Sequence, residues 1–146
     1  MKVTRRIIAL ASDHAGFEYK EAIKSYLVSR AMLVEDFGTY SLDPVDYPEF
    51  IRAAAKAVSN RQCQLGIILG GSGNEAIVAN RIAGIRCAVV WNRRTVQLSK
   101  EHGNCNMIAI GQRMMSQEEA LSLVEAWLAA EFKGGRHQRR IDSIDE

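Results

Sequence analysis

Short apolar runs alternate with helical patterns from one end of the chain to the other, and this alternation limits the possible folds more than any other feature. Five runs are expected to form buried strands: residues 6–11, 32–37, 65–69, 85–91 and 107–110. Helical spacing or composition marks the segments that follow them: residues 17–30, 51–58, 75–80, 95–101 and 117–132. Short strands that alternate with helices pair in parallel and are covered by helices on both faces. The sequence therefore predicts one doubly wound α/β domain over residues 1–146, with three layers and a five-stranded parallel sheet in the middle.

The composition narrows the class of protein. With 146 residues, of which 47% are hydrophobic and 25% charged, the chain is expected to form one soluble globular domain. A net charge of +2 is too small to indicate a nucleic-acid or membrane-surface partner, and no apolar run approaches the roughly 20 residues that cross a bilayer. Three cysteines, an odd number without a CxxC pair, argue against a disulfide framework and a structural zinc site, and favour a reducing cytoplasm.

A glycine-rich segment, Gly70–Asn74 (GGSGN), separates the third apolar run from the helix that follows it. Glycine lets the backbone approach a ligand closely, and the free N–H groups at a helix start point toward negative charge. Glu75, at the exit of this segment, is placed to move a proton while those N–H groups stabilise an oxyanion. The alternative is a tight β–α turn in which Glu75 only interacts favourably with the helix dipole.

Polar residues also follow other strands at the expected carboxyl edge of the sheet, where ligands bind in doubly wound folds. Asp13 and His14 follow the first strand, and Arg113 follows the fifth. For Asp13 the alternative is a cap on the helix that begins near Gly16. His102 comes just after a short helix, where a single histidine is more often a surface residue or a cap. No two histidines have metal-ligand spacing, so a metal centre is disfavoured.

The segment 134–140 (GGRHQRR) is a second distinctive feature. If the chain resumes as a helix after the glycines, Arg136 and Arg140 lie four residues apart on one face. Two guanidinium groups on one face suit the oxygens of a phosphate. The alternatives are a solvated basic end and nucleic-acid binding, which would need more basic and aromatic surface. Together, the candidate residues suit a small phosphorylated substrate that isomerises by proton transfer through an enediolate.

Taken in order, these motifs resemble the ribose-5-phosphate isomerase type B family, which also includes galactose-6-phosphate and allose-6-phosphate isomerases. The resemblance covers nearly the whole chain. It is carried by SDHAGF at 12–17, DYP at 46–48, GGSGNE at 70–75, ANR at 79–81, GIR at 84–86, His102 with Asn106, GQR at 111–113 and GGRHQRR at 134–140. The resemblance implies a Rossmann-like fold and a cis-enediol isomerase without metal or cofactor. It also implies a homodimer or a dimer of dimers with sites at the subunit interface.

The resemblance assigns catalytic roles to three residues. One branch of the family uses a cysteine at the end of the third strand as base, and Gly70 at that position excludes this mechanism here. The other branch uses a glutamate at the helix start, and Glu75 matches it. The resemblance then implies that His102 is the ring-opening acid, reaching a neighbouring subunit's pocket, and that Ser72 assists at the reacting end of the sugar.

The resemblance also implies a set of substrate contacts. Asp13 is expected to hold sugar oxygens, and the tail 133–146 is expected to supply arginines to the phosphate site. The expected phosphate ligands are His14, Arg113, Arg136 and Arg140. The amides expected to form an anion hole are those of Gly71, Ser72, Gly73 and Asn74. Two departures stand out: the glutamate branch usually has one more glycine before Glu75, and Gly103 stands where the family usually has a substrate-binding asparagine.

Four functions are to be distinguished. The leading one is the interconversion of ribose 5-phosphate and ribulose 5-phosphate, a step of the pentose phosphate pathway, with Glu75 as base. A hexose-6-phosphate isomerase has the same fold and chemistry, and the loop 38–48 and Gly103 could admit a longer sugar. A sugar-phosphate-binding protein without activity would keep the arginines but lose the geometry around Glu75. A dinucleotide-binding oxidoreductase is disfavoured because its glycine fingerprint should follow the first strand.

Overall fold

Five parallel strands form one sheet in the computed structural model, which describes residues 6–146. The strands are β1 (Ile7–Ser12), β2 (Leu33–Asp36), β3 (Leu65–Gly70), β4 (Cys87–Val89) and β5 (Met107–Gly111). Their order in the sheet is β2-β1-β3-β5-β4, and every neighbouring pair is parallel. Because β1, β3 and β5 lie side by side at the centre, the loops that leave their carboxyl ends are neighbours as well.

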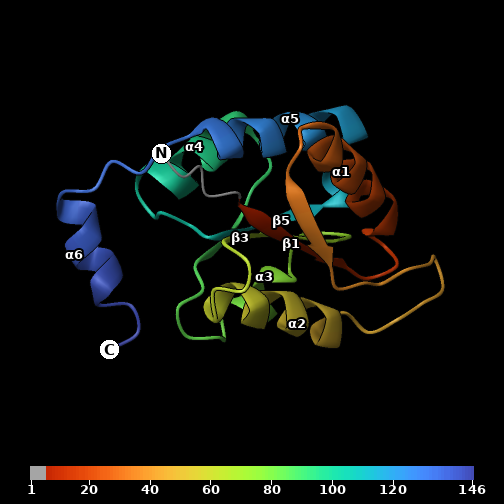
Figure 1. Ribbon diagram of the computed structural model, residues 1–146, viewed down its shortest axis with the longest axis horizontal. Helices are drawn as coiled ribbons and strands as arrows, with labels where there is room; N and C mark the ends of the chain where they lie inside the picture. Colours follow the sequence, from red (N-terminus) through yellow and green to blue (C-terminus); the bar gives the residue numbers. More distant parts are fainter. Residues whose placement is uncertain (1–5) are drawn as a thin grey trace.

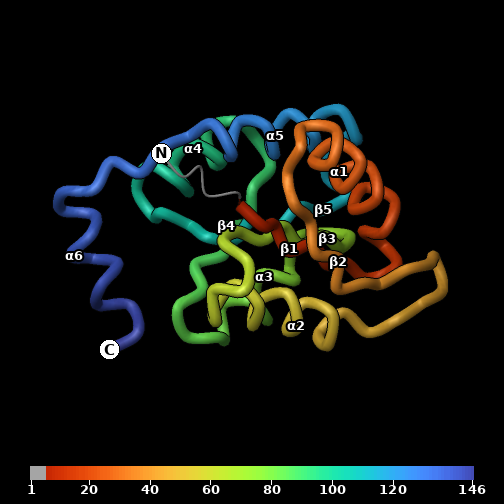
Figure 2. The backbone as a smooth tube through the Cα atoms, viewed as in Figure 1, coloured from red at the N-terminus to blue at the C-terminus, as the bar shows by residue number. Residues whose placement is uncertain are grey.

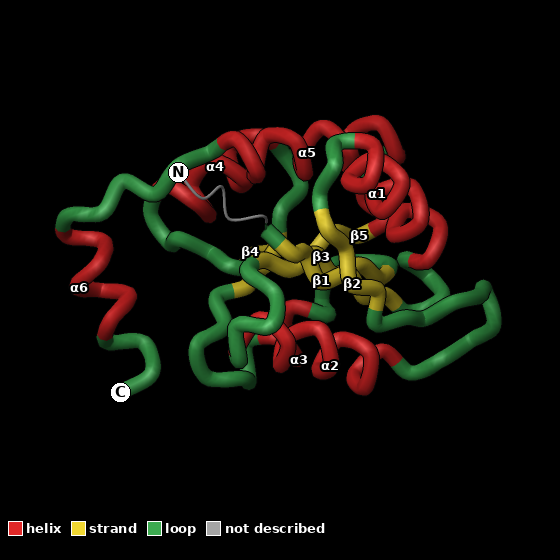
Figure 3. Tube along the Cα trace, in the orientation of Figure 1, coloured by secondary structure: helices red, strands yellow, loops and turns green. Residues whose placement is uncertain are grey.

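Helices cover both faces of the sheet, as Figures 1 and 3 show. One face carries α1 (Phe17–Ser29), α4 (Arg93–Glu101) and α5 (Gln117–Ala129). The other face carries α2 (Tyr47–Ser59) and the short α3 (Ala76–Ala79). The predicted three-layer α/β fold with a five-stranded parallel sheet is confirmed.

The two faces are packed differently because large and small side chains alternate along β1. Ile8 and Leu10 belong to the core under α1 and α5, which consists mainly of large aliphatic side chains and Trp127. Ala9 and Ala11 belong to the core under α2, whose own buried residues include three alanines. Small side chains on both partners allow α2 to lie close to the sheet.

A further helix, α6 (Arg136–Asp142), stands apart from the three layers (Figure 2). The chain reaches it through an extended segment after α5, where the N–H of Lys133 donates to the carbonyl of Glu101 (3.1 Å). Beyond α6, Asp145 Oδ2 accepts from the N–H of Gly84 (2.8 Å), which lies shortly before β4. The helix expected after the tail glycines therefore forms, and it lies beyond the amino ends of the strands.

Three predicted boundaries are corrected. α2 begins four residues earlier than predicted, at Tyr47, because Pro48 is compatible with the first turn of a helix. The fourth strand is shorter than predicted, since its pairing with β5 ends at Val89. α5 ends three residues earlier than predicted, at Ala129, because the backbone of Ala130 is extended (ψ 152°).

Candidate active site

The carboxyl edge of the sheet brings together most of the groups that the sequence singles out. Asp13 and His14 follow β1, and the glycine-rich loop 70–75 begins with the last residue of β3. Arg113 lies in a short 3₁₀ helix, η1 (Gln112–Met114), directly after β5. The central position of β1, β3 and β5 thus makes neighbours of residues that are far apart in the sequence.

Glu75 is buried at the end of the glycine-rich loop, with 4% of its surface exposed. Its carboxylate lies against the end of β3, in the space that a side chain on Gly70 would occupy. Oε1 accepts a hydrogen bond from the N–H of Gly73 (3.2 Å). Burial raises the pKa of Glu75 and the charge of Asp13 raises it further, while the Gly73 N–H acts in the opposite direction. A carboxylate with a raised pKa is a stronger base, which suits proton transfer.

Asp13 shapes the turn between β1 and α1. Its Oδ1 accepts from the N–H groups of Ala15 (2.9 Å) and Gly16 (3.1 Å). Gly16 itself is the N-cap of α1, so Asp13 stabilises the turn before the helix rather than capping it. The turn holds the Asp13 carboxylate close enough to Glu75 to influence the pKa of Glu75.

His14 connects the carboxyl edge to the long loop between β2 and α2. Its Nδ1 accepts from the N–H of Val45 (3.1 Å), so the hydrogen of the neutral ring is on Nε2. That arrangement leaves Nε2 as a donor that suits a phosphate oxygen. The sequence pattern does not predict this contact, because the backbone N–H of Val45 belongs to a loop that is distant from His14 in the sequence.

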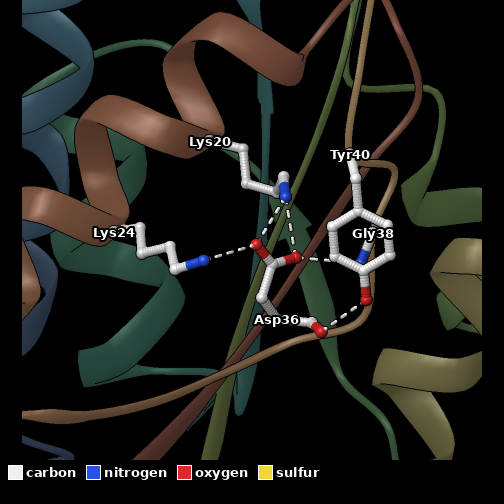
Figure 4. Close-up of polar contacts among 5 residues, drawn as sticks. All are labelled: Lys20, Lys24, Asp36, Gly38 and Tyr40. Carbon is white, nitrogen blue, oxygen red and sulfur yellow. Dashed lines mark hydrogen bonds and ion pairs between the residues drawn. The ribbon is translucent and has the colours of Figure 1, made fainter.

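A buried ion-pair cluster supports the start of the same loop (Figure 4). Lys20 is fully buried and donates to both carboxylate oxygens of Asp36 (2.7 Å each), and Lys24 donates to Oδ2 (3.0 Å). Asp36 also accepts from the N–H of Gly38 (2.8 Å), and Tyr40 Oη donates to the Asp36 carbonyl (2.9 Å). Burial by itself would raise the pKa of Asp36, but hydrogen bonds from Lys20, Gly38 and Lys24 lower it. The cluster fixes the place where the loop leaves β2, beside the last residue of β1.

The glycine-rich loop lies directly on the end of β5. The Arg113 side chain covers Gly71, and a Cβ on Gly71 would lie 2.9 Å from Nη1. The Arg113 N–H also donates to the Gly71 carbonyl (3.0 Å). A Cβ on Gly111 would lie 2.6 Å from the carbonyl carbon of Ser72, so glycine is required for this close approach. The sequence pattern singles out Gly71 but not the space requirement at Gly111, which arises between distant segments.

Two of the four amides expected in the anion hole are hydrogen-bonded within the loop. The Gly73 N–H donates to Glu75 (3.2 Å), and the Asn74 N–H donates to Ser72 Oγ (3.3 Å). Both bonds are longer than the about 2.9–3.0 Å that is usual for N–H···O. A substrate oxygen that takes over these donors would therefore replace weak bonds rather than strong ones.

The other predicted residues lie at the opposite edge of the sheet. His102 ends α4, which runs back from the carboxyl edge to the start of β5. The carbonyl of Gly103 accepts a hydrogen bond (3.0 Å) from Nε of Arg86, the residue directly before β4. Within one chain, the structure therefore does not bring His102 and Gly103 together with Glu75. The reason is topological, because a helix that joins two parallel strands returns the chain to their amino ends.

α6 carries its basic residues on the same side as His102. The imidazole rings of His102 and His137 stack, with centroids 4.4 Å apart and planes 13° apart. Desolvation lowers the pKa of His137, and the neighbouring His102, Arg136 and Arg140 lower it further. The two arginines are exposed on α6, which lies on the far side of the molecule from the loop between β2 and α2 (Figure 1). The tail arginines are thus near His102 but cannot serve Glu75 of their own chain.

Residues 6–146 give little support for a metal site, a membrane-spanning helix or a second catalytic pocket. No group of three or more His, Cys, Asp or Glu side chains in this range lies close enough together to hold a metal ion. No helix in the same range has the length and hydropathy needed to cross a membrane. A hollow of about 460 Å³ lies at the amino edge, beside Arg61, Arg86 and Asn106. Its lining has neither a carboxylate nor a histidine, so it does not suit acid–base chemistry.

Comparisons with known proteins match the chain over almost its full length. A model of the Ribose/Galactose Isomerase family matches residues 8–144. A Mycolicibacterium paratuberculosis protein called ribose-5-phosphate isomerase B is 46% identical over 142 residues, which are 95% of this chain and 89% of that protein. The solved Clostridium thermocellum ribose-5-phosphate isomerase B has a TM-score of 0.94 and 41% identity, over 95% of each chain. The Mycoplasma genitalium enzyme, solved with bound ribulose-5-phosphate, has a TM-score of 0.90 and 36% identity, over 94% of this chain and 93% of that one.

Proposed function

Because the chain belongs to the ribose/galactose isomerase family, we propose that it is an aldose–ketose isomerase that interconverts ribose 5-phosphate and ribulose 5-phosphate. The names of its relatives support the substrate, and one of them was solved with ribulose-5-phosphate bound. The geometry at the carboxyl edge supports the chemistry, independently of those names.

The observation that carries the proposal is the buried carboxylate of Glu75 beside the glycine-rich loop. Isomerisation of an aldose requires a base that removes the proton from C2 and returns it to C1, through a cis-enediol. Glu75 has a raised pKa and is held in place by the loop, which suits this role. The loop amides then stabilise the oxygen that becomes negative during the transfer, and Ser72 assists at the same end of the sugar.

We also propose that a second copy of the chain completes the site. His102 lies at the amino edge, so it meets Glu75 only across an interface between two copies. There it would donate the proton that opens the sugar ring, with Gly103 beside it. Asp13 would hold sugar oxygens at the carboxyl edge. The phosphate would be bound by His14 and Arg113 of one copy and by Arg136 and Arg140 of the other. The exposure of both tail arginines on a projecting helix supports this division.

A coupled assay over five- and six-carbon sugar phosphates tests the proposal. We expect the highest kcat/KM with ribose 5-phosphate and ribulose 5-phosphate, and incorporation of solvent deuterium when the reaction runs in D₂O. A higher kcat/KM with allose 6-phosphate or galactose 6-phosphate would instead assign the chain to hexose phosphates. Binding without turnover or deuterium incorporation would make it a sugar-phosphate-binding protein. Loss of activity on addition of a chelator would overturn the expectation that no metal takes part.

A further inference from the structure

Gly70 ends β3, and its backbone conformation does not require glycine. It pairs in register with Gly111 of β5, and its φ lies outside the left-handed region that Gly73 occupies (φ 92°). A glycine within a strand weakens that strand, because it gains more chain entropy on unfolding and packs no side chain. The absence of a side chain at this position therefore calls for a reason other than backbone geometry.

The reason lies in the position of the neighbouring acid. An ideal Cβ on Gly70 would overlap Cδ and both carboxylate oxygens of Glu75. The carboxylate thus fills the volume that any other residue at position 70 would need for its first side-chain atom. Glu75 is 4% exposed, so its carboxylate is enclosed at this place rather than resting on an open surface.

We propose that Gly70 is a positioning residue for the reaction, because its missing side chain allows the Glu75 carboxylate to lie against β3 beside the loop amides. A methyl group at position 70 would push the carboxylate out of this space and away from the Gly73 N–H. Misplacement of a reacting group by about 1 Å can cost on the order of a hundredfold in rate. The effect on turnover rests on the proposed function, whereas the exclusion between position 70 and Glu75 rests on packing alone.

Gly66 provides a matched control in the same strand. It lies four residues before Gly70, is also buried, and presents its side-chain position to the same face of the sheet. A Cβ there would lie 2.9 Å from Cε of Met107, the terminal atom of a flexible side chain, and 3.1 Å from both Cγ of Met107 and Cγ2 of Val58, so a small local shift is expected. Gly66→Ala thus adds the same methyl group to the same strand without displacing Glu75.

The first test compares the kinetics of Gly70→Ala and Gly66→Ala with ribose 5-phosphate. We expect Gly70→Ala to lower kcat by roughly a hundredfold with little change in KM, and Gly66→Ala to stay within a few-fold of the wild type. The acid limb of the pH–rate profile should also move to lower pH in Gly70→Ala, because a displaced carboxylate is less desolvated. A purely structural role for Gly70 would leave that limb in place. Full activity of Gly70→Ala with an unchanged profile would overturn the proposal.

The second test is a thermal-stability cycle with Glu75→Ala. Gly70→Ala should lower Tm in the wild-type background and have little effect in the Glu75→Ala background, where the space is empty. If Gly70→Ala does not fold at all, folding of the double variant supports the proposal in the same way. Equal losses of Tm in both backgrounds, or failure of the double variant to fold, would overturn it. The Tm result does not depend on catalysis. If Glu75→Ala were active, Glu75 would not be the base, but the Tm cycle would still test whether a side chain at position 70 excludes the Glu75 carboxylate.

Discussion

At the carboxyl edge of the sheet the two candidate acids are buried by their own chain, whereas His102 at the amino edge and the two arginines of α6 are exposed. At the carboxyl edge, Asp13 and Glu75 have 8% and 4% of their surface exposed, and the ring of His14 is fixed by a backbone bond. At the amino edge, His102 is exposed and stacks on a ring from α6, a helix outside the three layers.

This difference is consistent with the roles proposed above, in which Glu75 transfers the proton and the tail arginines help to bind the phosphate. Proton transfer needs a desolvated base in a fixed position, which packing within one chain can provide. The tail arginines are cations, whose burial without a partner is costly, so they remain in water until the substrate neutralises them. Because the two regions lie at opposite edges of the sheet, each can be altered separately.

The largest effect is expected when the chemistry of the carboxyl edge is removed. Glu75→Gln keeps the shape of the side chain but cannot accept a proton, so kcat should fall by about a thousandfold or more with KM within a few-fold. Steady-state kinetics with ribose 5-phosphate measure this. The matched control is Glu18→Gln, on the exposed surface of α1, which should leave both constants unchanged. Near-normal turnover of Glu75→Gln would show that another group is the base.

A smaller and selective loss is expected at the amino edge. His102→Gln should lower the conversion of cyclic ribose 5-phosphate by about a hundredfold, because the ring-opening acid is missing. Ribulose 5-phosphate has no furanose ring, so exchange of its C1 hydrogen with deuterium from solvent should be much less affected. Both rates can be followed by NMR in D₂O. Equal losses of exchange and conversion would contradict a role for His102 in ring opening.

Complementation tests directly whether the two regions meet across an interface. The double variant Arg136→Ala/Arg140→Ala should raise KM by at least about a hundredfold, since each of the two guanidinium contacts to phosphate contributes roughly 1.5–3 kcal/mol. The double variant is then refolded as an equal mixture with Glu75→Gln. Random pairing should give about a quarter of the wild-type kcat/KM, because half of the dimers contain one intact site.

The control for complementation mixes Glu75→Gln with Asp13→Asn. Both changes affect the carboxyl edge, so every site in the mixed dimer keeps one defect and activity should not return. If the mixture with the arginine double variant also stays inactive, the site is not shared between two copies in the way proposed.

The smallest expected effect is a gain of stability in Glu75→Gln that depends on pH. Below about pH 4 the side chain of Glu75 is protonated in both folded and unfolded chains, so wild type and variant should unfold at similar temperatures. As the pH rises, the unfolded chain releases its proton first, because the folded pKa is raised, and the wild type loses stability relative to the variant. Tm measured from pH 4 to pH 8 should diverge in favour of Glu75→Gln, and a constant or opposite difference would contradict the raised pKa.

Much of the fold could be read from local pattern, because helices and strands follow the spacing of apolar residues. The alternation of short runs with helical segments predicted the parallel sheet and its helical layers, and glycines followed by Glu75 predicted the loop and its acid. The position of His102 could have been inferred as well. A residue that follows a helix and precedes a strand lies at the amino edge, away from the glycine-rich loop.

The amino-acid sequence by itself determined which chemical groups the protein has and which secondary-structure element carries each of them. Only the tertiary structure decided that β1, β3 and β5 are neighbours, that Glu75 is buried against Gly70, and that His14 is bound by the backbone of Val45. The physical reason is that periodicity is a local property of the chain, while burial, pKa and the space at a glycine depend on segments that meet only when the sheet is assembled.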